Sequence, residues 1–455
     1  MAVWGLWSRS LGSEGSDPCS PSTLTFLRVA VSLKFLERVG RSCYTPEAMI
    51  AAPQARKQVG RFSTLGRIGS TLLFCLLTLA LAWSPAMAAD LGQWVPGLKL
   101  TTFLSERAEY ESNVFQVPSR SQGDVIFWTI PGIRADYTFG SHSLSAGYRA
   151  EFLNYVTLTS QDNIHHIFSS DLRLDFPRTL ITVSDNFART SAPPGTELSG
   201  PIESTTNTLS VAGRYKLSPT FSVGPSFSWV HQSFDESFVG DRINRDEFLG
   251  GASVFWALSP KTDLSLTYNH GWTAFTQASD RDYTSDGFTV GLNGRLTAKL
   301  SSTFFAGYTH QTADNGNSQV EYRGWVTGGG WTYTPTEKTT ITLSTLRSTQ
   351  ASTDGANAYY VTTSAFLSVG VQLLPKVTVD ARLGGGMNDY PTKDTIDGKT
   401  DWRQDDFLAA GGGITYAIQR WLQVGLDYVR TSRHSNFSSF NFVDERVSGR
   451  VTVQF

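Results

Sequence analysis

The side chains best suited to catalysis or metal binding are a histidine pair, His165-His166, and an acidic pair, Asp405-Asp406. Neighbouring residues of an extended strand point to opposite faces, so the two histidines are not expected to bind one metal ion together. The acidic side chains have neither a histidine nor a serine placed to complete an acid–base system. We therefore expect both pairs to be structural or solvated, the acids binding at most divalent ions together with lipopolysaccharide.

Motifs for nucleophilic or phosphate chemistry are missing from the sequence. It contains no His-Glu-x-x-His or Gly-x-Ser-x-Gly pattern. Glycine runs at 328–330, 384–386 and 411–413 lack the lysine and hydroxyl residue that follow a phosphate-binding loop. Such glycines are expected to allow strong strand curvature or close packing beside aromatic side chains. The sequence therefore predicts no enzyme and no metal ion or other cofactor.

The charged side chains of residues 98–455 follow a two-residue period. Between Leu144 and Phe152, for example, apolar residues alternate with Arg149, Glu151 and small polar residues. The alternation recurs along the chain, so one face suits lipid and the other suits water. Opposite charges on the watery face are expected to pair across neighbouring strands, in a hydrated pore whose field orients polar solutes. The residues expected to face this lumen are Arg134, Asp136, Arg149, Glu151, Asp171, Arg173, Arg214, Lys216, Arg295, Asp380, Arg382, Asp427 and Arg450.

These side chains require strands to position them, and the pattern predicts strands throughout residues 98–455. We predict an all-β fold, a transmembrane antiparallel up-and-down β-barrel of eighteen strands, with sixteen as the alternative count. Short connections, often with proline, alternate with long ones rich in Ser, Asp, Asn and Gly, as in outer-membrane barrels. The predicted strands begin near Leu98, Val125, Ser143, Ile164, Thr179, Thr205, Thr220, Glu247, Thr262, Gly287, Ser301, Gly324, Thr339, Ala358, Val377, Phe407, Arg420 and Phe440.

Two long connections, Thr190–Ser204 and Tyr390–Asp401, are the loops expected to narrow a pore. Eighteen strands enclose more space than their own side chains fill, so a water-filled channel is the default expectation. Asp185 departs from the pattern because it shares a face with Ile181 and Val183. Either a β-bulge shifts the phase there or the residue lies above the hydrocarbon.

The first 88 residues have a different character. An apolar run, Ser70–Trp83, follows several basic residues and precedes Ala86-Met87-Ala88, the pattern of a signal peptide cleaved between Ala88 and Ala89. Such a peptide would begin at Met49. We therefore expect residues 1–48 to be an overextended amino terminus, 49–88 the signal peptide, 89–97 a short periplasmic segment and 98–455 the barrel.

Export would leave a chain without cysteine and with a net negative charge. The 455 residues include 38 Lys and Arg and 40 Asp and Glu; residues 1–88 hold nine of the former, four of the latter and all three cysteines, so residues 89–455 carry a formal charge of −7. An exported protein without disulfides needs another source of stability, which a closed sheet in lipid supplies. The negative charge argues against nucleic acid as a partner.

Two short stretches, Tyr110–Phe115 and Val183–Arg189, together with the signal peptide, the uniform strands and the terminal Phe455, resemble the putative β-barrel porin 2 family. The resemblance implies a barrel in the outer membrane of a Gram-negative bacterium, in a family many of whose members are associated with exopolysaccharide or capsule export. Val451, Val453 and Phe455 also look like the signal read by the outer-membrane assembly machinery. The implied partners are that machinery, outer-membrane lipid, lipopolysaccharide and polysaccharide export components.

We expect a porin-like channel for hydrophilic solutes, with exopolysaccharide or capsule secretion favoured through the resemblance alone. One alternative is a non-conducting scaffold or surface-display barrel, which predicts a lumen occluded by bulky side chains and folded loops. Another is a barrel hydrolase, which predicts an acid beside a histidine or serine above the membrane. A sugar path would require aromatic side chains along the lumen, and Phe366 is one of few inward candidates.

Overall fold

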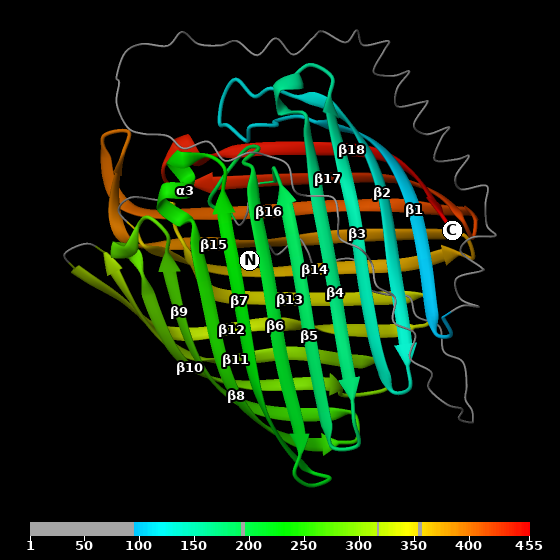
Figure 1. Ribbon diagram of the computed structural model, residues 1–455. Coiled ribbons are helices and arrows are strands. Elements are labelled where there is room, and N and C mark those ends of the chain that lie inside the picture. Colours follow the sequence, from blue (N-terminus) through cyan, green and yellow to red (C-terminus); the bar gives the residue numbers. More distant parts are fainter. Residues whose placement is uncertain (1–94, 193–195, 316–317, 354–356) are drawn as a thin grey trace, which may run out of the picture. The chain divides into compact units, whose positions relative to one another are not determined.

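A single antiparallel sheet forms the barrel in the computed structural model, which describes residues 95–455 except 193–195, 316–317 and 354–356 (Figure 1). Each of the eighteen strands pairs with its neighbours in sequence, and β1 also pairs with β18, so the sheet is closed. The predicted fold class is confirmed. The expected division at residues 48 and 88 lies outside the described residues. The strands are β1 (Leu98–Glu111), β2 (Asp124–Phe139), β3 (His142–Tyr155), β4 (Asn163–Asp175), β5 (Thr179–Thr190), β6 (Ser204–Lys216), β7 (Phe221–Phe234), β8 (Arg245–Ser259), β9 (Thr262–Phe275), β10 (Tyr283–Arg295), β11 (Leu300–Asn315), β12 (Ser318–Thr336), β13 (Thr339–Ala351), β14 (Tyr359–Leu374), β15 (Val377–Ile396), β16 (Lys399–Gln419), β17 (Leu422–Ser435) and β18 (Phe442–Gln454).

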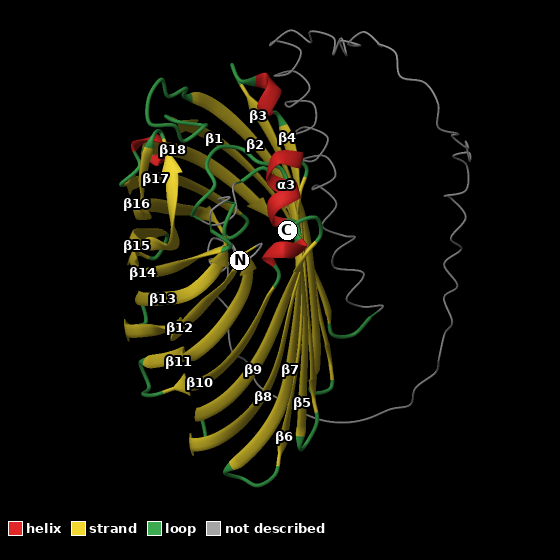
Figure 2. Cartoon of the chain, turned by 90° about the vertical axis from the view of Figure 1, so that its left-hand side faces the viewer, coloured by secondary structure: helices red, strands yellow, loops and turns green. Residues whose placement is uncertain are grey.

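Helical turns occur only in the long connections of the described chain. They are α3 (Ser237–Ile243) and three short 3-10 turns, η2 (Thr159–Gln161), η3 (Ser279–Arg281) and η4 (Ser438–Phe440). Figure 2 shows β3–β9 and β10–β17 as opposite walls of the barrel. Within the part of the chain that the structure describes, no helix is both long and apolar enough to cross a membrane.

Alternating burial explains why these sequences form a barrel wall. On β18 the side chains of Val443, Val447 and Val451 are 45–52% exposed and share one face, whereas Asp444 on the other face is fully buried. This sheet exposes valine on its outer face and buries a carboxylate on its inner face. A soluble β-sandwich has the opposite arrangement, with apolar side chains inside and polar side chains outside. The arrangement on β18 matches a strand with lipid outside and polar groups within.

The carboxyl terminus closes the ring through its backbone. The amide of Phe455 donates to the carbonyl of Thr102 at 2.8 Å, and the amide of Thr102 donates to the carbonyl of Phe455 at 3.0 Å. The β1–β18 register then continues without a shift to the pair Glu111 and Arg446. Because the first and last strands pair directly, neither edge remains to be satisfied.

One predicted loop is wrong. The segment Tyr390–Asp401 is mostly strand, because β15 continues to Ile396, β16 starts at Lys399, and only Asp397-Gly398 forms the turn. Both turn residues have positive φ, 53° and 77°, which suits a two-residue hairpin with an Asp-Gly turn. The polar composition of this hairpin hid its strand character, and the start predicted for β16, Phe407, was consequently eight residues late.

Asp185 lies in a regular strand. The β4–β5 and β5–β6 registers run without interruption through Asp185, which opposes Ser170 and Leu209, so a bulge is excluded there. The side chain therefore stays on the outer face with Val183. Its Oδ1 has no hydrogen-bond partner.

The assignment of the two faces makes a prediction about stability. Val447→Arg places a charge on the outer face in the middle of β18, and we expect it to lower the free energy of unfolding by about 2–4 kcal/mol. The adjacent inner-face change Ser448→Arg is the matched control and should cost far less. Denaturant titration of the barrel refolded in liposomes measures both, and equal losses would contradict the assignment.

Candidate functional site

The loop between β5 and β6 crosses the interior of the barrel. Thr196 in this loop exchanges hydrogen bonds with Asn388 of β15, at 3.0 and 2.8 Å. Arg433 of β17 donates from Nη1 to the carbonyls of Thr196 and Glu197, at 3.0 and 2.7 Å. Since β5 and β6 lie across the ring from β15, a loop that joins them passes through the lumen or over its mouth. The side chains it contacts, Asn388 and Arg433 among them, therefore face inward.

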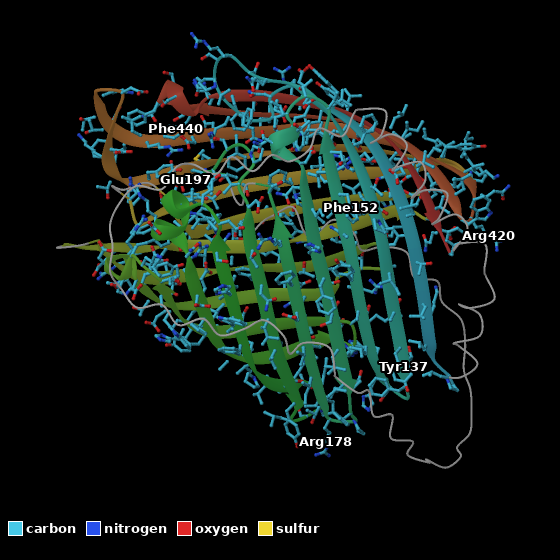
Figure 3. The ribbon with its side chains drawn as sticks, turned by 45° about the horizontal axis from the view of Figure 1, so that its top comes forward. Tyr137, Phe152, Arg178, Glu197, Arg420 and Phe440 are labelled. Carbon is cyan, nitrogen blue, oxygen red and sulfur yellow. The ribbon has the colours of Figure 1, made fainter. Side chains whose placement is uncertain are left out.

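Glu197 is the anchor of this loop (labelled in Figure 3). Its carboxylate accepts hydrogen bonds from Ser352 Oγ at 2.6 Å and from the amide of Thr353 at 2.7 Å, in the connection between β13 and β14. Arg403 of β16 lies 3.8 Å away, with both charged side chains at most 5% exposed. A buried carboxylate with this many partners holds a loop firmly, because any rearrangement leaves charges unpaired.

Arg403 links the anchor to the wall. Its guanidinium binds Asp405 of the same strand at 2.6 Å and packs against the rings of Tyr390 and Phe440, 4.5 and 3.5 Å from their centroids. Asp405 is fully buried. Charge pairing and cation–π contacts together satisfy the arginine on every side.

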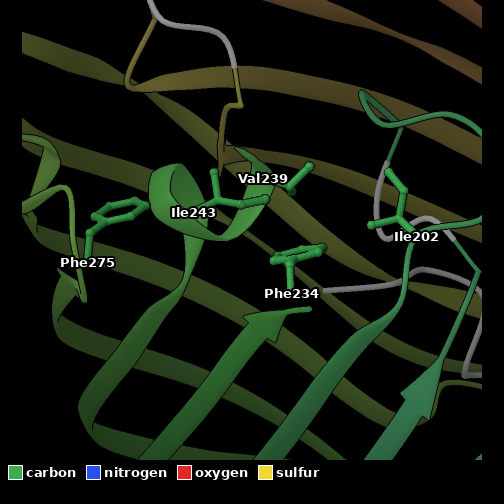
Figure 4. Packing of buried hydrophobic residues seen from close by; sticks show 5 residues of the cluster. All are labelled: Ile202, Phe234, Val239, Ile243 and Phe275. Carbon is green, nitrogen blue, oxygen red and sulfur yellow. The ribbon is translucent and has the colours of Figure 1, made fainter. Parts of the chain in front are cut away.

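An apolar cluster supports the loop on the opposite side (Figure 4). Ile202 of the loop packs with Val239 and Ile243 of α3 and with Phe234 and Phe275 at the ends of β7 and β9. The same helix donates a hydrogen bond from Arg242 to the carbonyl of Thr353 at 3.0 Å. The loop, α3 and the β13–β14 connection thus form one assembly that narrows the long-loop end of the lumen.

The thirteen residues predicted to line the lumen share the face of Arg433 and alternate with exposed apolar residues such as Ile133, Tyr148 and Leu383. Most carry an ionic partner two positions away on the same strand. One such pair is Arg149–Glu151, with 2.8 Å between its charged groups. The others are Arg134–Asp136, Arg173–Asp175 and Arg382–Asp380.

The expectation that these charges pair across neighbouring strands is wrong for most of them. Residues two apart on a strand share a face and lie within reach of a long arginine side chain. Two arginines bind acids on other strands, but not on neighbouring ones: Arg214 of β6 binds Asp263 of β9 at 2.7 Å, and Arg382 of β15 also binds Asp427 of β17. The inner wall is therefore largely self-neutralised.

Charge is unevenly distributed around this wall. Inward acids and bases concentrate on the contiguous strands β15–β18 and β1–β4. Among the described side chains of β11–β14, the inner face carries none; it presents hydroxyl, amide, apolar and aromatic groups. A solute in the lumen thus meets one uncharged sector of four strands, β11–β14, in a wall that elsewhere carries charged side chains.

The residues considered for catalysis do not converge. Asp405 is bound by Arg403, and Asp406 lies on the opposite, outer face. Two other acids near the long-loop end, Asp282 and Asp286, are separated as well: Asp282 accepts a hydrogen bond from the amide of Phe275, whereas Asp286 contacts Tyr268 Oη and His270 Nδ1 on the outer face. In residues 95–455 as described, no group of three His, Cys, Asp or Glu side chains is suited to hold a metal ion.

The two adjacent histidines separate as expected. His165 faces inward, between Glu151 Oε2 at 3.2 Å and Ser191 Oγ at 2.9 Å, whereas His166 contacts Tyr148 Oη at 2.8 Å on the outer face. His165 therefore helps to seat the start of the inward loop, because Ser191 is its first residue.

Comparison with known proteins agrees with this architecture. The family model for putative beta-barrel porin 2 matches residues 100–455. The chain belongs to the putative β-barrel porin 2 family. Porins of this kind are proteins of the Gram-negative outer membrane. A comparison with curated proteins gives no significant match.

The solved structures with some likeness to this chain include an outer-membrane protein, an outer-membrane channel and a porin. OpdK of Pseudomonas aeruginosa, in a crystal structure with vanillate, is 13% identical, with 78% of this chain and 99% of that chain covered and a TM-score of 0.42. DcaP of Acinetobacter baumannii is 14% identical, with 79% and 97% covered and a TM-score of 0.41. A BenF-like porin of Pseudomonas fluorescens Pf-5 is 11% identical, with 79% and 100% covered and a TM-score of 0.43. At these scores the likeness adds nothing to what the sheet itself shows.

The path of the loop leads to a cross-linking prediction. Because residues 89–455 contain no cysteine, the double variant Thr196→Cys/Asn388→Cys should form one disulfide, detected as a shift in mobility of the denatured, unreduced chain. Thr196→Cys/Gln404→Cys is the control, since Gln404 lies on the outer face. A disulfide in the control, or none in the first variant, would show that the loop does not cross the lumen.

Proposed function

We propose that this family member is a channel for hydrophilic solutes across the outer membrane, narrowed by the loop of residues 191–203. The closed barrel of eighteen strands with a polar inner wall carries the proposal. A barrel of this size leaves an aqueous interior unless a loop or plug fills it. The inward assembly around Glu197 occupies one end of that interior.

The paired charges predict how ions should pass. An arginine that is neutralised by an acid two residues away contributes little net charge, so selectivity between simple ions should be weak. Substitution of Arg149, Arg214 and Arg382 by alanine removes the bases and leaves the partner acids. We expect the reversal potential in a salt gradient to move toward cation selectivity, and an unchanged potential would contradict a charge-lined path.

We also propose the finer steps that the family resemblance suggests. In this proposal the chain is exported with cleavage between Ala88 and Ala89, and assembly machinery reads Val451, Val453 and Phe455. The permeant would then be an exopolysaccharide or capsule chain, delivered by other export components. The exposed side chains of Val451 and Phe455, at 45% and 43%, support a terminal recognition signal.

The inward assembly also favours a second candidate, a non-conducting scaffold. Conductance of the refolded chain of residues 89–455 in a planar bilayer separates the two. Steady steps of current support a channel. No current from a barrel with correct heat-modified mobility on a gel would support the scaffold and reject the channel.

Removal of the loop anchor tests the site directly. Glu197→Ala deletes the carboxylate that binds Ser352, Thr353 and Arg403, and we expect the loop to leave the lumen and single-channel conductance to rise. Glu203→Ala, in the same connection but paired with the exposed Arg189, is the matched control and should leave conductance unchanged. Equal conductance in both variants would show that the anchor does not set the width of the pore.

A further inference from the structure

A row of inward-facing residues, one on each strand from β8 to β16, runs around half of the barrel wall. Three of its members are phenylalanine and three are glycine. Hydrogen-bonded registers connect it strand by strand, through Phe255, Ser265, Gly291, Phe305, Gly328, Leu346, Ser364, Gly386 and Phe407, from β8 to β16. Phe407 shares a face with Arg403 and Asp405 beneath the inward loop, so the whole row faces the lumen. Phe366 lies two residues from Ser364 on the same face.

Glycine lets three of these rings lie against the wall. A Cβ at Gly328 would be 2.6 Å from Cζ of Phe305, and one at Gly386 would be 2.8 Å from Cζ of Phe407. A Cβ at Gly384 would overlap the ring of Phe366. Each ring therefore lies over the glycine backbone of a neighbouring strand. A side chain at that glycine would displace the ring. The Phe305 side chain remains 39% exposed.

Phe255 at the start of the row is different. The Arg214 guanidinium covers its ring, with Cζ 4.4 Å from the centroid. The phenylalanines that remain, Phe305, Phe366 and Phe407, are three and two strands apart. With strands about 4.8 Å apart, the steps between them are about 14 and 10 Å. Because barrel strands tilt by about 35–45°, a row perpendicular to them climbs along the wall as it goes around.

The surroundings of Phe305 and Phe366 on β11–β14 are polar but uncharged, whereas Phe407 on β16 opposes Arg433 and lies two residues from Asp405. The inner faces of β11–β14, as far as their side chains are described, carry hydroxyl groups such as those of Thr303, Ser344 and Ser368. Hydroxyls donate and accept hydrogen bonds with little preference for one partner. Flat apolar surfaces beside such groups suit a ligand whose rings have apolar faces and hydroxylated edges.

We propose that Phe305, Phe366 and Phe407 form a track on which the pyranose rings of a neutral saccharide chain stack as it passes through the lumen. The proposal rests on the proposed channel function and names its substrate class. The lack of charge along β11–β14 selects neutral over acidic chains. The spacing of the three rings selects a chain of several sugars over a monosaccharide.

Current block in a planar bilayer tests the track. The probes are maltohexaose, a neutral linear glucan, and polyethylene glycol of similar mass, which obstructs a pore without presenting rings. We expect maltohexaose to block wild-type current reversibly. The triple variant Phe305→Leu/Phe366→Leu/Phe407→Leu keeps apolar volume but no flat face, and it should raise the half-blocking concentration by about tenfold or more.

Phe103→Leu is the matched control. Phe103 also packs over a glycine, Gly132, but on β1 and β2, away from the row. It should leave the block by maltohexaose unchanged, and every variant should leave the effect of polyethylene glycol unchanged. Phe366→Tyr retains a flat ring and should retain the block.

Two results would overturn the track. A conducting triple variant that is blocked by maltohexaose as well as wild type refutes it while leaving the channel intact, and an equal loss in the Phe103 control refutes the assignment to this row. If the folded barrel does not conduct, the channel proposal fails on its own. Calorimetric titration of the detergent-solubilised barrel with maltohexaose then tests the track, since absence of binding in wild type, or equal binding in the triple variant, rejects it.

Discussion

Pairing of β1 with β18 is the constraint on which the rest of the molecule depends. In hydrocarbon every backbone amide and carbonyl must be satisfied within the protein, and a sheet achieves this only by closing on itself. The mutual hydrogen bonds of Phe455 and Thr102 complete that closure. Once the ring is closed, alternation places every second side chain inside, so the composition of the lumen follows from sequence parity alone.

Closure also determines what a loop can do. A segment that leaves the wall between β5 and β6 and reaches β15 and β17 must cross the lumen or its mouth. Two parts of the loop are held by different interactions: Ile202 near its end by apolar packing against α3, and Glu197 in its middle by hydrogen bonds and buried charge. Apolar packing tolerates small shifts, whereas a buried carboxylate does not. The position of the loop is therefore set mainly at Glu197.

Periodicity was sufficient to predict the fold class and the number of strands. It failed where composition and periodicity disagree, as in the β15–β16 hairpin, whose Asp397-Gly398 turn was the overlooked signal. The role of Glu197 could not be predicted from the sequence, because it depends on contacts with Ser352, Arg403 and Arg433, all more than 150 residues away. The aromatic row was missed for the same reason, because Phe305 and Gly328 become neighbours only through the register of β11 with β12.

The arrangement of charge in pairs along single strands has an evolutionary consequence. Arg134–Asp136, Arg149–Glu151 and Arg173–Asp175 each neutralise themselves without help from another strand. A hairpin built from such strands can be duplicated, deleted or exchanged between genes without leaving an unpaired charge in the barrel wall. A barrel made of hairpins whose charges are paired internally can gain or lose two strands at a time. It can still insert into the membrane after each change.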